Sequence, residues 1–230
     1  MRSRKIYWMV VMAIFSFAIV TNAQEQQVLN PGSIEEDPLS AWICLQTELE
    51  KGGDAVSRYF EVFLTKGDFV PFDIYYYDSG DKEYQEVGVA VGHKAFSIHG
   101  LDFWALPYFV VATDSEYLGP TFWINGDWEK WAFSSLAMYY LPLEKEGTEQ
   151  FNTFNTYFNY KVNDWLQAGV GGNLSWMNGR DEEWHWRLGP NFVIKDPVNI
   201  MPGGQGDLHL RFTWGEDEDW RLFLRKTFAF

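Results

Sequence analysis

The sequence lacks the features that stabilise small disulfide-rich proteins or anchor helical membrane proteins. Cys44 is the only cysteine among 230 residues, so the chain cannot form an internal disulfide. Beyond its first 23 residues, no apolar run approaches the roughly 20 residues that a transmembrane helix needs. Positive charge is also scarce, with 18 Lys and Arg against 32 Asp and Glu. A chain this acidic is not expected to bind nucleic acid.

The N-terminus carries the pattern of a secretory signal peptide. Arg2, Arg4 and Lys5 precede an apolar segment, residues 6–20 (IYWMVVMAIFSFAIV), and the small residues Thr-Asn-Ala precede Gln24. The apolar segment of 15 residues is short for a retained transmembrane anchor. We therefore expect that the N-terminal segment is a cleaved signal peptide and that the protein is exported.

The rest of the chain divides into a leader and one folded domain. The signal peptide is predicted to cover residues 1–23. Residues 24–40 are polar, contain two prolines and show no periodicity, which predicts a flexible periplasmic leader. Residues 41–230 are predicted to form a single domain.

Aromatic residues, by contrast, are abundant: 12 Trp, 12 Tyr and 19 Phe make up 19% of the chain. In an exported chain without a spanning helix, this composition suggests a β-barrel with aromatic girdles. Segments in which apolar and polar residues alternate recur between clusters of Gly, Asp and Asn. Twelve such segments can be counted: 42–50, 57–65, 69–77, 84–94, 103–113, 121–125, 131–141, 152–162, 166–176, 184–194, 208–214 and 220–230.

We therefore predict an all-β fold, a transmembrane antiparallel β-barrel in the bacterial outer membrane. Twelve strands are expected, and most segments have the roughly 9–11 residues that a tilted spanning strand needs. Ten strands remain possible, because the sixth segment is short and the eleventh is of modest length. An odd number would be unusual for this class of barrel.

Four of the connections between the segments are acidic, and they fall at alternate positions along the chain. They are residues 78–86 (DSGDKEYQE), 143–150 (LEKEGTEQ), 178–183 (NGRDEE) and 215–219 (GEDED). If the chain starts in the periplasm, all four lie on the outer side of the membrane. Divalent cations could bridge them to lipopolysaccharide, although ordinary solvated loops have the same composition. The expected partners are thus outer-membrane lipid and lipopolysaccharide.

The chain closes on an amphipathic segment, WRLFLRKTFAF (Trp220–Phe230). Its apolar face ends with Phe228 and Phe230, which resembles the signal that the outer-membrane barrel assembly machinery reads. Lys226 departs from that pattern and would have to extend toward an interface. A secreted β-sandwich could end in the same way, but the signal peptide, the strand count and this ending together favour a barrel.

The alternation also predicts which side chains point into the lumen, because an arginine facing lipid at the bilayer centre costs about 2–4 kcal/mol. The last three segments place a basic cluster inside: His185, Arg187, His209, Arg211, Arg221 and Arg225. The first four place an acidic wall inside: Glu48, Glu50, Glu61, Asp73 and Glu86. The two walls should meet where the last strand pairs with the first. They would create a transverse field across a water-filled pore, or ion pairs that plug a narrow lumen.

Small and aromatic side chains share the inward face with these charges. Inward residues such as Gly88, Gly169 and Gly171 are expected to leave open volume. Four inward aromatic residues lie near the acidic wall: Tyr59, Phe63, Tyr75 and Tyr77. They could stack on sugars or nucleobases, or they could fill the interior of a narrow barrel.

Residues 58–80 (RYFEVFLTKGDFVPFDIYYYDSG) resemble the early hairpin of the nucleoside-specific (Tsx-like) outer-membrane channels. The matching positions are Tyr59, Glu61, Phe63, Asp68, Phe69, Asp73, Tyr75 and Tyr77. The resemblance covers about a tenth of the chain, and it implies a twelve-stranded monomeric channel with an aromatic-lined lumen that binds nucleosides. Acidic-sugar channels are the other twelve-stranded comparison. They favour an arginine-rich lumen, which only the last three segments offer here.

An enzyme of the serine–histidine kind would need a hydroxyl within hydrogen-bond reach of an imidazole. His185 and His209 are predicted to point inward, but no inward serine is clearly placed against them, and Ser175 is only a distant candidate. Zinc-ligand spacing, a phosphate loop and a nucleophile elbow are all missing from the sequence. We therefore predict no catalytic residue, no metal and no cofactor.

The predicted function is a passive outer-membrane channel, or porin, for small hydrophilic solutes such as nucleosides or sugars. The alternatives are an outer-membrane enzyme acting on lumenal or lipid substrates, and a structural barrel that does not conduct.

Overall fold

The computed structural model describes residues 39–50, 55–80, 84–144, 147–178, 184–195, 206–215 and 220–229. The predicted signal peptide and most of the predicted leader lie outside these residues, and the first strand already begins at Leu39. The described residues form β-strands in the following order: β1 (Leu39–Glu50), β2 (Ala55–Lys66), β3 (Phe69–Ser79), β4 (Gln85–Ile98), β5 (Leu101–Ala105), β6 (Tyr108–Ala112), β7 (Glu116–Gly119), β8 (Thr121–Asp127), β9 (Trp131–Pro142), β10 (Gln150–Lys161), β11 (Leu166–Met177), β12 (Trp184–Lys195), β13 (Asp207–Gly215) and β14 (Trp220–Ala229). Among them no helix has the length and apolar character needed to cross a membrane.

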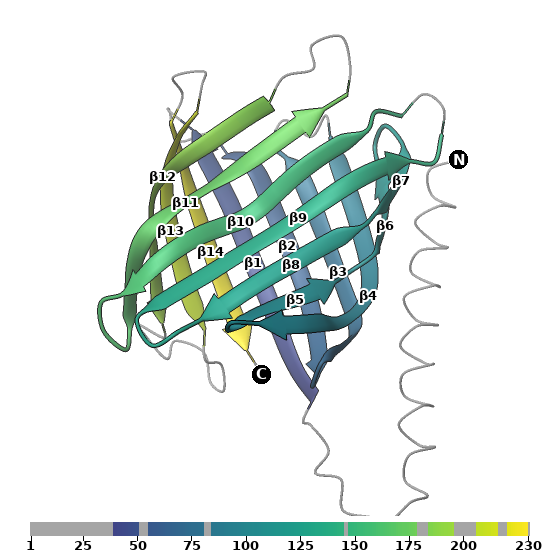
Figure 1. Cartoon of the computed structure of the whole chain (residues 1–230). Helices are drawn as coiled ribbons and strands as arrows, with labels where there is room; N and C mark the ends of the chain where they lie inside the picture. Colours follow the sequence, from purple (N-terminus) through teal and green to yellow (C-terminus); the bar gives the residue numbers. More distant parts are fainter. Residues whose placement is uncertain are drawn as a thin grey trace, which may run out of the picture.

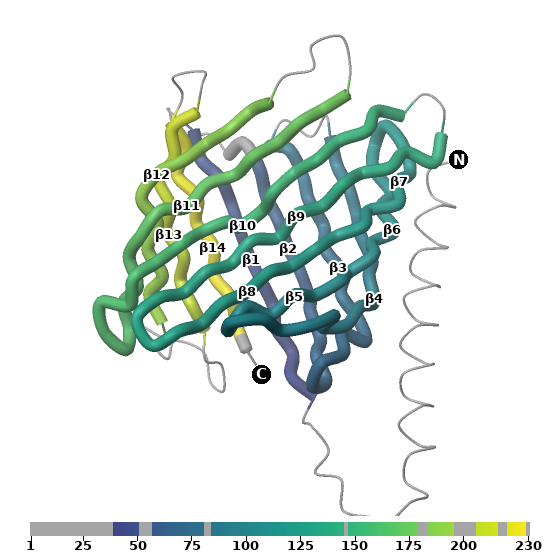
Figure 2. The backbone as a smooth tube through the Cα atoms, in the orientation of Figure 1, coloured from purple at the N-terminus to yellow at the C-terminus, as the bar shows by residue number. Residues whose placement is uncertain are grey.

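The strands close into one antiparallel barrel (Figures 1 and 2). Neighbours in sequence pair around most of the barrel, and β14 pairs with β1 to close it. Between β4 and β9, two strand positions are each divided into two short strands: β5 and β6 both pair with β4, whereas β7 and β8 both pair with β9. The fourteen strands therefore occupy twelve positions, which confirms the twelve-stranded prediction.

A pair of prolines explains the two divided positions. Ala105 pairs with Phe122 and Tyr108 with Gly119 in the same register, so Pro107 lies opposite Pro120. Proline has no N–H to donate to a ladder, and the sheet is interrupted at this level on both strands. The sixth segment looked short in the sequence because it covers only β8. The other half of this strand position is β7, which lies before Pro120 in the chain.

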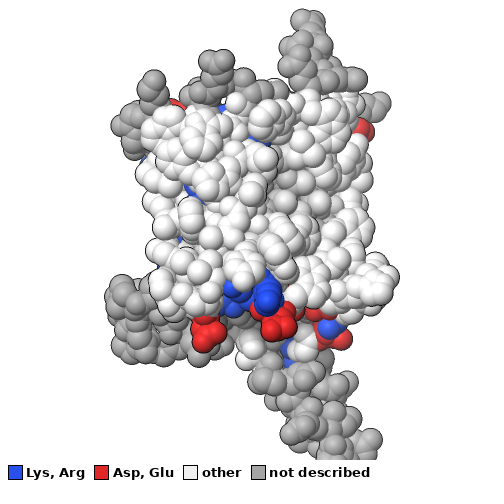
Figure 3. Space-filling model, turned by 60° about the vertical axis from the view of Figure 1, so that its left-hand side comes forward, with Lys and Arg blue, Asp and Glu red and all other residues white. Residues whose placement is uncertain are grey.

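The outward face of the barrel is apolar and exposed, as the alternation of side chains requires. Exposed apolar residues occur on nearly every strand and include Leu45, Phe60, Phe122, Val170 and Trp186. Figure 3 shows a broad band almost without charged side chains, with Lys, Arg, Asp and Glu gathered at its lower edge. A closed barrel with such a band suits a hydrocarbon environment. Each of its strands pairs with a neighbour on both sides, and the band itself is apolar.

The C-terminal strand fits this outward band. Phe228 lies on the outward face of β14, opposite Ile43 of β1, whereas Phe230 is outside the described residues. Lys226 shares the outward face, and its ammonium group lies 5.4 Å from the centre of the Phe228 ring and beside Gly206, which precedes β13. The lysine thus reaches toward the lower rim of the barrel.

The strands that flank the four acidic connections end and begin at one end of the barrel, the upper end in Figure 1, whereas residues 81–83, 145–146, 179–183 and 216–219 of the connections lie outside the described residues. This is the end at which β1 finishes, while β1 starts and β14 finishes at the lower end. The arrangement follows from antiparallel pairing, because every second connection returns to the same end.

Candidate functional site in the lumen

A cavity of about 520 Å³ occupies the part of the lumen nearest the upper end. Its wall is built from side chains of β1 to β4, Tyr108 of β6, β9 to β14 and the connections at that end. Nine of the predicted site residues line it: Glu48, Tyr59, Tyr75, Tyr77, Glu86, His185, Arg187, Arg211 and Arg221. The structure therefore brings residues from both predicted clusters around a single space.

The other predicted lumen residues do not line this cavity. Glu61, Phe63, Asp73, His209 and Arg225 lie closer to the lower end, and they are buried or partly buried there. Glu50 lies at the upper end of β1, opposite Arg221 in the β1–β14 pairing.

The acidic and basic walls meet at the seam where the barrel closes. Arg221 on β14 lies 3.6 Å from a carboxylate oxygen of Glu48 on β1. Arg225 lies 3.6 Å from a carboxylate oxygen of Glu61, which is on β2. The Arg225 side chain therefore reaches past β1 to the next strand. All four side chains are less than one third exposed, so solvent screens these ion pairs less than pairs on the surface.

Another inward carboxylate, that of Glu86 on β4, accepts hydrogen bonds from tyrosine hydroxyl groups. Tyr75 and Tyr140 each donate a hydrogen bond of 3.0 Å to Glu86 Oε1, and Tyr84 donates one of 2.6 Å to Oε2. Tyr140 comes from β9, three strand positions away from β4 around the barrel. We call Tyr75, Tyr84, Glu86 and Tyr140 the tyrosine–carboxylate wall of the cavity.

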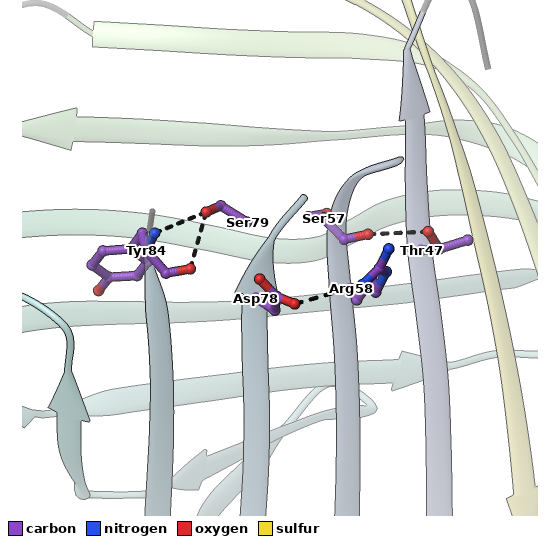
Figure 4. Close-up of polar contacts among 6 residues, drawn as sticks. All are labelled: Thr47, Ser57, Arg58, Asp78, Ser79 and Tyr84. Atoms are coloured by element: carbon purple, nitrogen blue, oxygen red, sulfur yellow. Dashed lines mark hydrogen bonds and ion pairs between the residues drawn. The ribbon is translucent and has the colours of Figure 1, made fainter. Parts of the chain in front are cut away.

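Local backbone contacts position Tyr84 for this role (Figure 4). The Ser79 amide donates to the Tyr84 carbonyl (2.9 Å), and the Tyr84 amide donates to Ser79 Oγ (3.0 Å), which closes the connection between β3 and β4. Tyr84 lies outside the strands. Its burial, and to a smaller extent the nearby negative charge of Glu86, raises the pKa of its hydroxyl well above the ordinary value. Its hydroxyl is therefore a neutral donor to Glu86 at every physiological pH.

The same strands carry a separate polar contact on their outward face. Arg58 on β2 lies 3.7 Å from Asp78 on β3 (Figure 4), and Thr47 Oγ1 donates to the Ser57 carbonyl at 3.0 Å. Arg58 points away from the lumen, since Phe60, two residues further on, is exposed on the outer surface.

We call Arg187, Arg211 and Arg221 the arginine wall. Arg211 is 2% exposed, and its Nη1 donates to the carbonyl oxygens of Thr156 (3.2 Å) and Gly172 (3.3 Å). Its guanidinium carbon lies 4.2 Å from the centre of the Phe223 ring. These contacts hold the cation against neutral groups of β10, β11 and β14.

At the floor of the cavity and below it, aromatic side chains from strands that do not pair touch one another inside the barrel. Phe63 on β2 contacts Trp123 on β8 edge to face, with ring centres 5.4 Å apart. Tyr75 and Tyr108 are 5.3 Å apart, and both belong to a buried cluster that also contains Met138. The interpretation that aromatic residues fill a narrow barrel therefore applies to this part of the lumen.

Buried polar contacts also join strands that are two positions apart in the barrel wall. Tyr108 of β6 donates a hydrogen bond to Asp73 of β3, which is fully buried. Asn191 of β12 donates to Asn159 of β10 (3.1 Å), and both amides are buried. Like the Glu61–Arg225 pair, these contacts place polar side chains inside the barrel and hold neighbouring parts of its wall together.

The prediction that inward glycines leave open volume is wrong for at least two of them. A Cβ atom at Gly88 would lie 2.2 Å from the Tyr75 ring, and one at Gly171 would lie 2.9 Å from Arg211 Cδ. The glycines instead allow a large side chain from another strand to lie flat against the barrel wall. One irregular residue does border the cavity: Asn155 has φ 49° at a β-bulge in β10.

The structure also corrects the position of Ser175. Ser175 on β11 pairs directly with His185 on β12, and both line the cavity, so the serine is not a distant candidate. Proximity alone does not make a nucleophile, which also needs an oriented base and an oxyanion-stabilising group. Among the described residues, no cluster of His, Cys, Asp or Glu has the arrangement of a metal site.

Sequence reasoning missed Tyr84, Tyr108 and Tyr140. The alternation along 131–141 could have assigned Tyr140 to the lumen, since it shares parity with Ser134 and Met138. Nothing local could have shown that Tyr140 and Glu86 meet, because β4 and β9 pair with different strands.

Comparison with known proteins identifies the fold. No family model matches the sequence, and no curated protein matches it either. Among solved structures, the KdgM porin superposes with a TM-score of 0.56 at 6% identity, covering 82% of this chain and 99% of that one. A structure of the KdgM porin in complex with disordered oligogalacturonate gives the same values, and the NanC porin gives 0.54 at 8% identity over 81% and 98% of the two chains. The chain thus has the fold of outer-membrane porins, and with its apolar outer band it belongs in the bacterial outer membrane.

Proposed function

We propose that this protein is a passive outer-membrane channel for small hydrophilic solutes, with sugars and nucleosides as the candidate classes. The observation that carries the proposal is the cavity of about 520 Å³ between the arginine wall and the tyrosine–carboxylate wall. A volume of this order is typical of sites that hold one small molecule. A solute would enter from the upper end and diffuse down its gradient, without a cofactor.

The residues below the cavity would form the constriction. Arg225 of β14 reaches Glu61 of β2, two strand positions away, and Phe63 of β2 contacts Trp123 of β8, four positions away. Charged and aromatic groups at a narrow section set which solutes pass and how fast. Passage in this proposal requires these side chains to change rotamer.

The aromatic residues of the cavity support a ring-shaped solute. Tyr59 and Tyr75 are stacked 5.6 Å apart with 20° between their planes, and Tyr77 lies beside them in the cavity wall. Flat rings with hydroxyl groups can contact both a sugar and a nucleobase. The resemblance of residues 58–80 to nucleoside-specific channels favours nucleosides, whereas the arginine wall favours sugars that carry an acid group.

A second candidate is a barrel that binds a solute without conducting it. The contacts across the lower lumen favour this function, because Phe63 touches Trp123 and Tyr108 reaches Asp73.

Planar-bilayer conductance of the refolded protein tests the proposal. Discrete conductance steps are expected for the wild type, and larger steps for Phe63→Ala combined with Trp123→Ala, because both rings at the constriction are removed. Phe60→Ala is the matched control, since Phe60 lies on the same strand and faces outward. Conductance that is absent from both the wild type and the double variant would reject the channel and support the closed barrel.

A further inference from the structure

The two walls of the cavity differ in how their charges are balanced. Glu86 accepts hydrogen bonds from three tyrosine hydroxyl groups, and Glu48 is paired with Arg221. The carboxylates that face the cavity are therefore already stabilised by groups of the protein itself. A cationic solute would have to displace one of these partners to bind there.

Arg211 is in the opposite situation. It is 2% exposed, and its contacts within the described part of the chain are two carbonyl oxygens and the face of the Phe223 ring. None of the carboxylates that the structure describes lies within ion-pair distance of it. The Glu48 charge acts on Arg211 only from beyond ion-pair distance and is already paired with Arg221. A buried cation without a direct ion pair is costly, and a bound anion would relieve that cost.

Unpartnered polar atoms point to the same side of the cavity. The Nε atoms of Arg211 and Arg221 are buried and have no hydrogen-bond partner. The same is true of Gln46 Oε1 and Asn173 Oδ1, and all four residues line the cavity. The two arginines supply donors for an anion, and the two amides supply acceptors for hydroxyl groups.

We infer that the cavity selects solutes that carry a carboxylate or phosphate group together with hydroxyl groups, and that Arg211 is the residue that binds the anion. The inference rests on the proposed function and specifies the solute class of that same cavity. The acid group binds on the side of Arg211 and Arg221, because planar guanidinium groups match carboxylate and phosphate oxygens. The ring of the solute then faces Tyr59 and Tyr77 on the other side.

Calorimetric titration of the refolded protein in detergent micelles tests this inference without requiring conduction. Glucuronate is compared with glucose, and uridine monophosphate with uridine, so that the carboxylate and phosphate are assessed separately. At least one anion is expected to bind ten times more tightly than its neutral counterpart. Equal binding within both pairs, or no binding of any of the four compounds, would overturn the inference. The bilayer conductance would still test the channel.

Variants of Arg211 complete the experiment. Arg211→Gln should abolish the preference for the anion, measured as the ratio of the dissociation constants of the neutral compound and the anion. Arg211→Lys, which keeps the charge but loses the planar fork, should retain part of the preference. Arg58→Gln is the matched control, because Arg58 lies on the outward face and should have no effect. A loss that is equal in Arg211→Gln and Arg58→Gln would reject the role of Arg211.

Folding of each variant is checked by the mobility of unheated samples in gel electrophoresis, where a folded barrel migrates differently from the denatured chain. If Arg211→Gln does not fold, Arg211→Lys is compared with the wild type instead. An anion preference equal to that of the wild type would then contradict the proposal that the planar guanidinium group of Arg211 binds the anion.

Discussion

The tyrosine–carboxylate wall and the arginine wall face the same cavity but differ in what holds them. On the first, Glu86 receives three hydroxyl donors from β3, β9 and the connection before β4. On the second, Arg211 is held by backbone carbonyls and an aromatic ring. The polar groups of the first wall satisfy one another, whereas Arg211 on the second has no direct ion pair among the described residues and is the group that we propose to bind a solute.

Replacing Arg225 should give the largest effect on stability. Arg225→Ala leaves Glu61 in the lumen without its cation, which should lower the free energy of unfolding by about 3–5 kcal/mol. Urea unfolding of the refolded protein in lipid vesicles measures this change. The double variant Arg225→Ala/Glu61→Gln should recover much of the loss, and a double variant no more stable than the single one would show that the ion pair is not the cause.

Removing the acceptor of the tyrosine–carboxylate wall should have a smaller effect. Glu86→Leu leaves the hydroxyl groups of Tyr75, Tyr84 and Tyr140 without their acceptor, and we expect a loss of about 1–3 kcal/mol in the same unfolding experiment. Glu86→Gln keeps an amide oxygen that can accept hydrogen bonds and should lose less. Equal losses would mean that packing of the side chain, not its hydrogen bonds, decides stability.

Neutralising the arginine wall should change selectivity more than stability. Replacing Arg187, Arg211 and Arg221 with Gln is expected to lower the ratio of anion to cation permeability by less than tenfold. This corresponds to a free-energy difference of up to about 1.4 kcal/mol. The loss of Arg221 adds to the effect, because it leaves the Glu48 charge in the cavity uncompensated. Reversal potentials in a salt gradient measure the ratio, and an unchanged ratio would show that these side chains do not line a conducting path.

The outward pair of Arg58 and Asp78 should contribute least. The Arg58 side chain is 56% exposed and lies 3.7 Å from Asp78, whose side chain is 7% exposed, so solvent screens the attraction from the arginine side only. Arg58→Gln should change the unfolding free energy by at most about 1 kcal/mol. A loss as large as that of Arg225→Ala would contradict the distinction between ion pairs inside and outside the barrel.

Much of the fold could be predicted from the sequence because strand alternation is local. The twelve segments correspond to the twelve strand positions, and inward residues such as Glu48, Glu86 and Arg211 face the lumen as their parity requires. The division at Pro107 and Pro120 was not recognised, since only the register shows that the two prolines lie opposite each other. The roles of the inward residues in binding or selectivity remain predictions.

The alternation of apolar and polar residues by itself determined the fold class, the apolar outer face and the charge of each strand's inner face. This was possible because each side chain's direction depends only on its place in its own strand. The tertiary structure alone decided which inward side chains meet: Tyr140 with Glu86, Arg225 with Glu61, and Tyr108 with Asp73. These contacts join strands that are far apart in sequence or do not pair, so they depend on how the closed barrel brings its walls together.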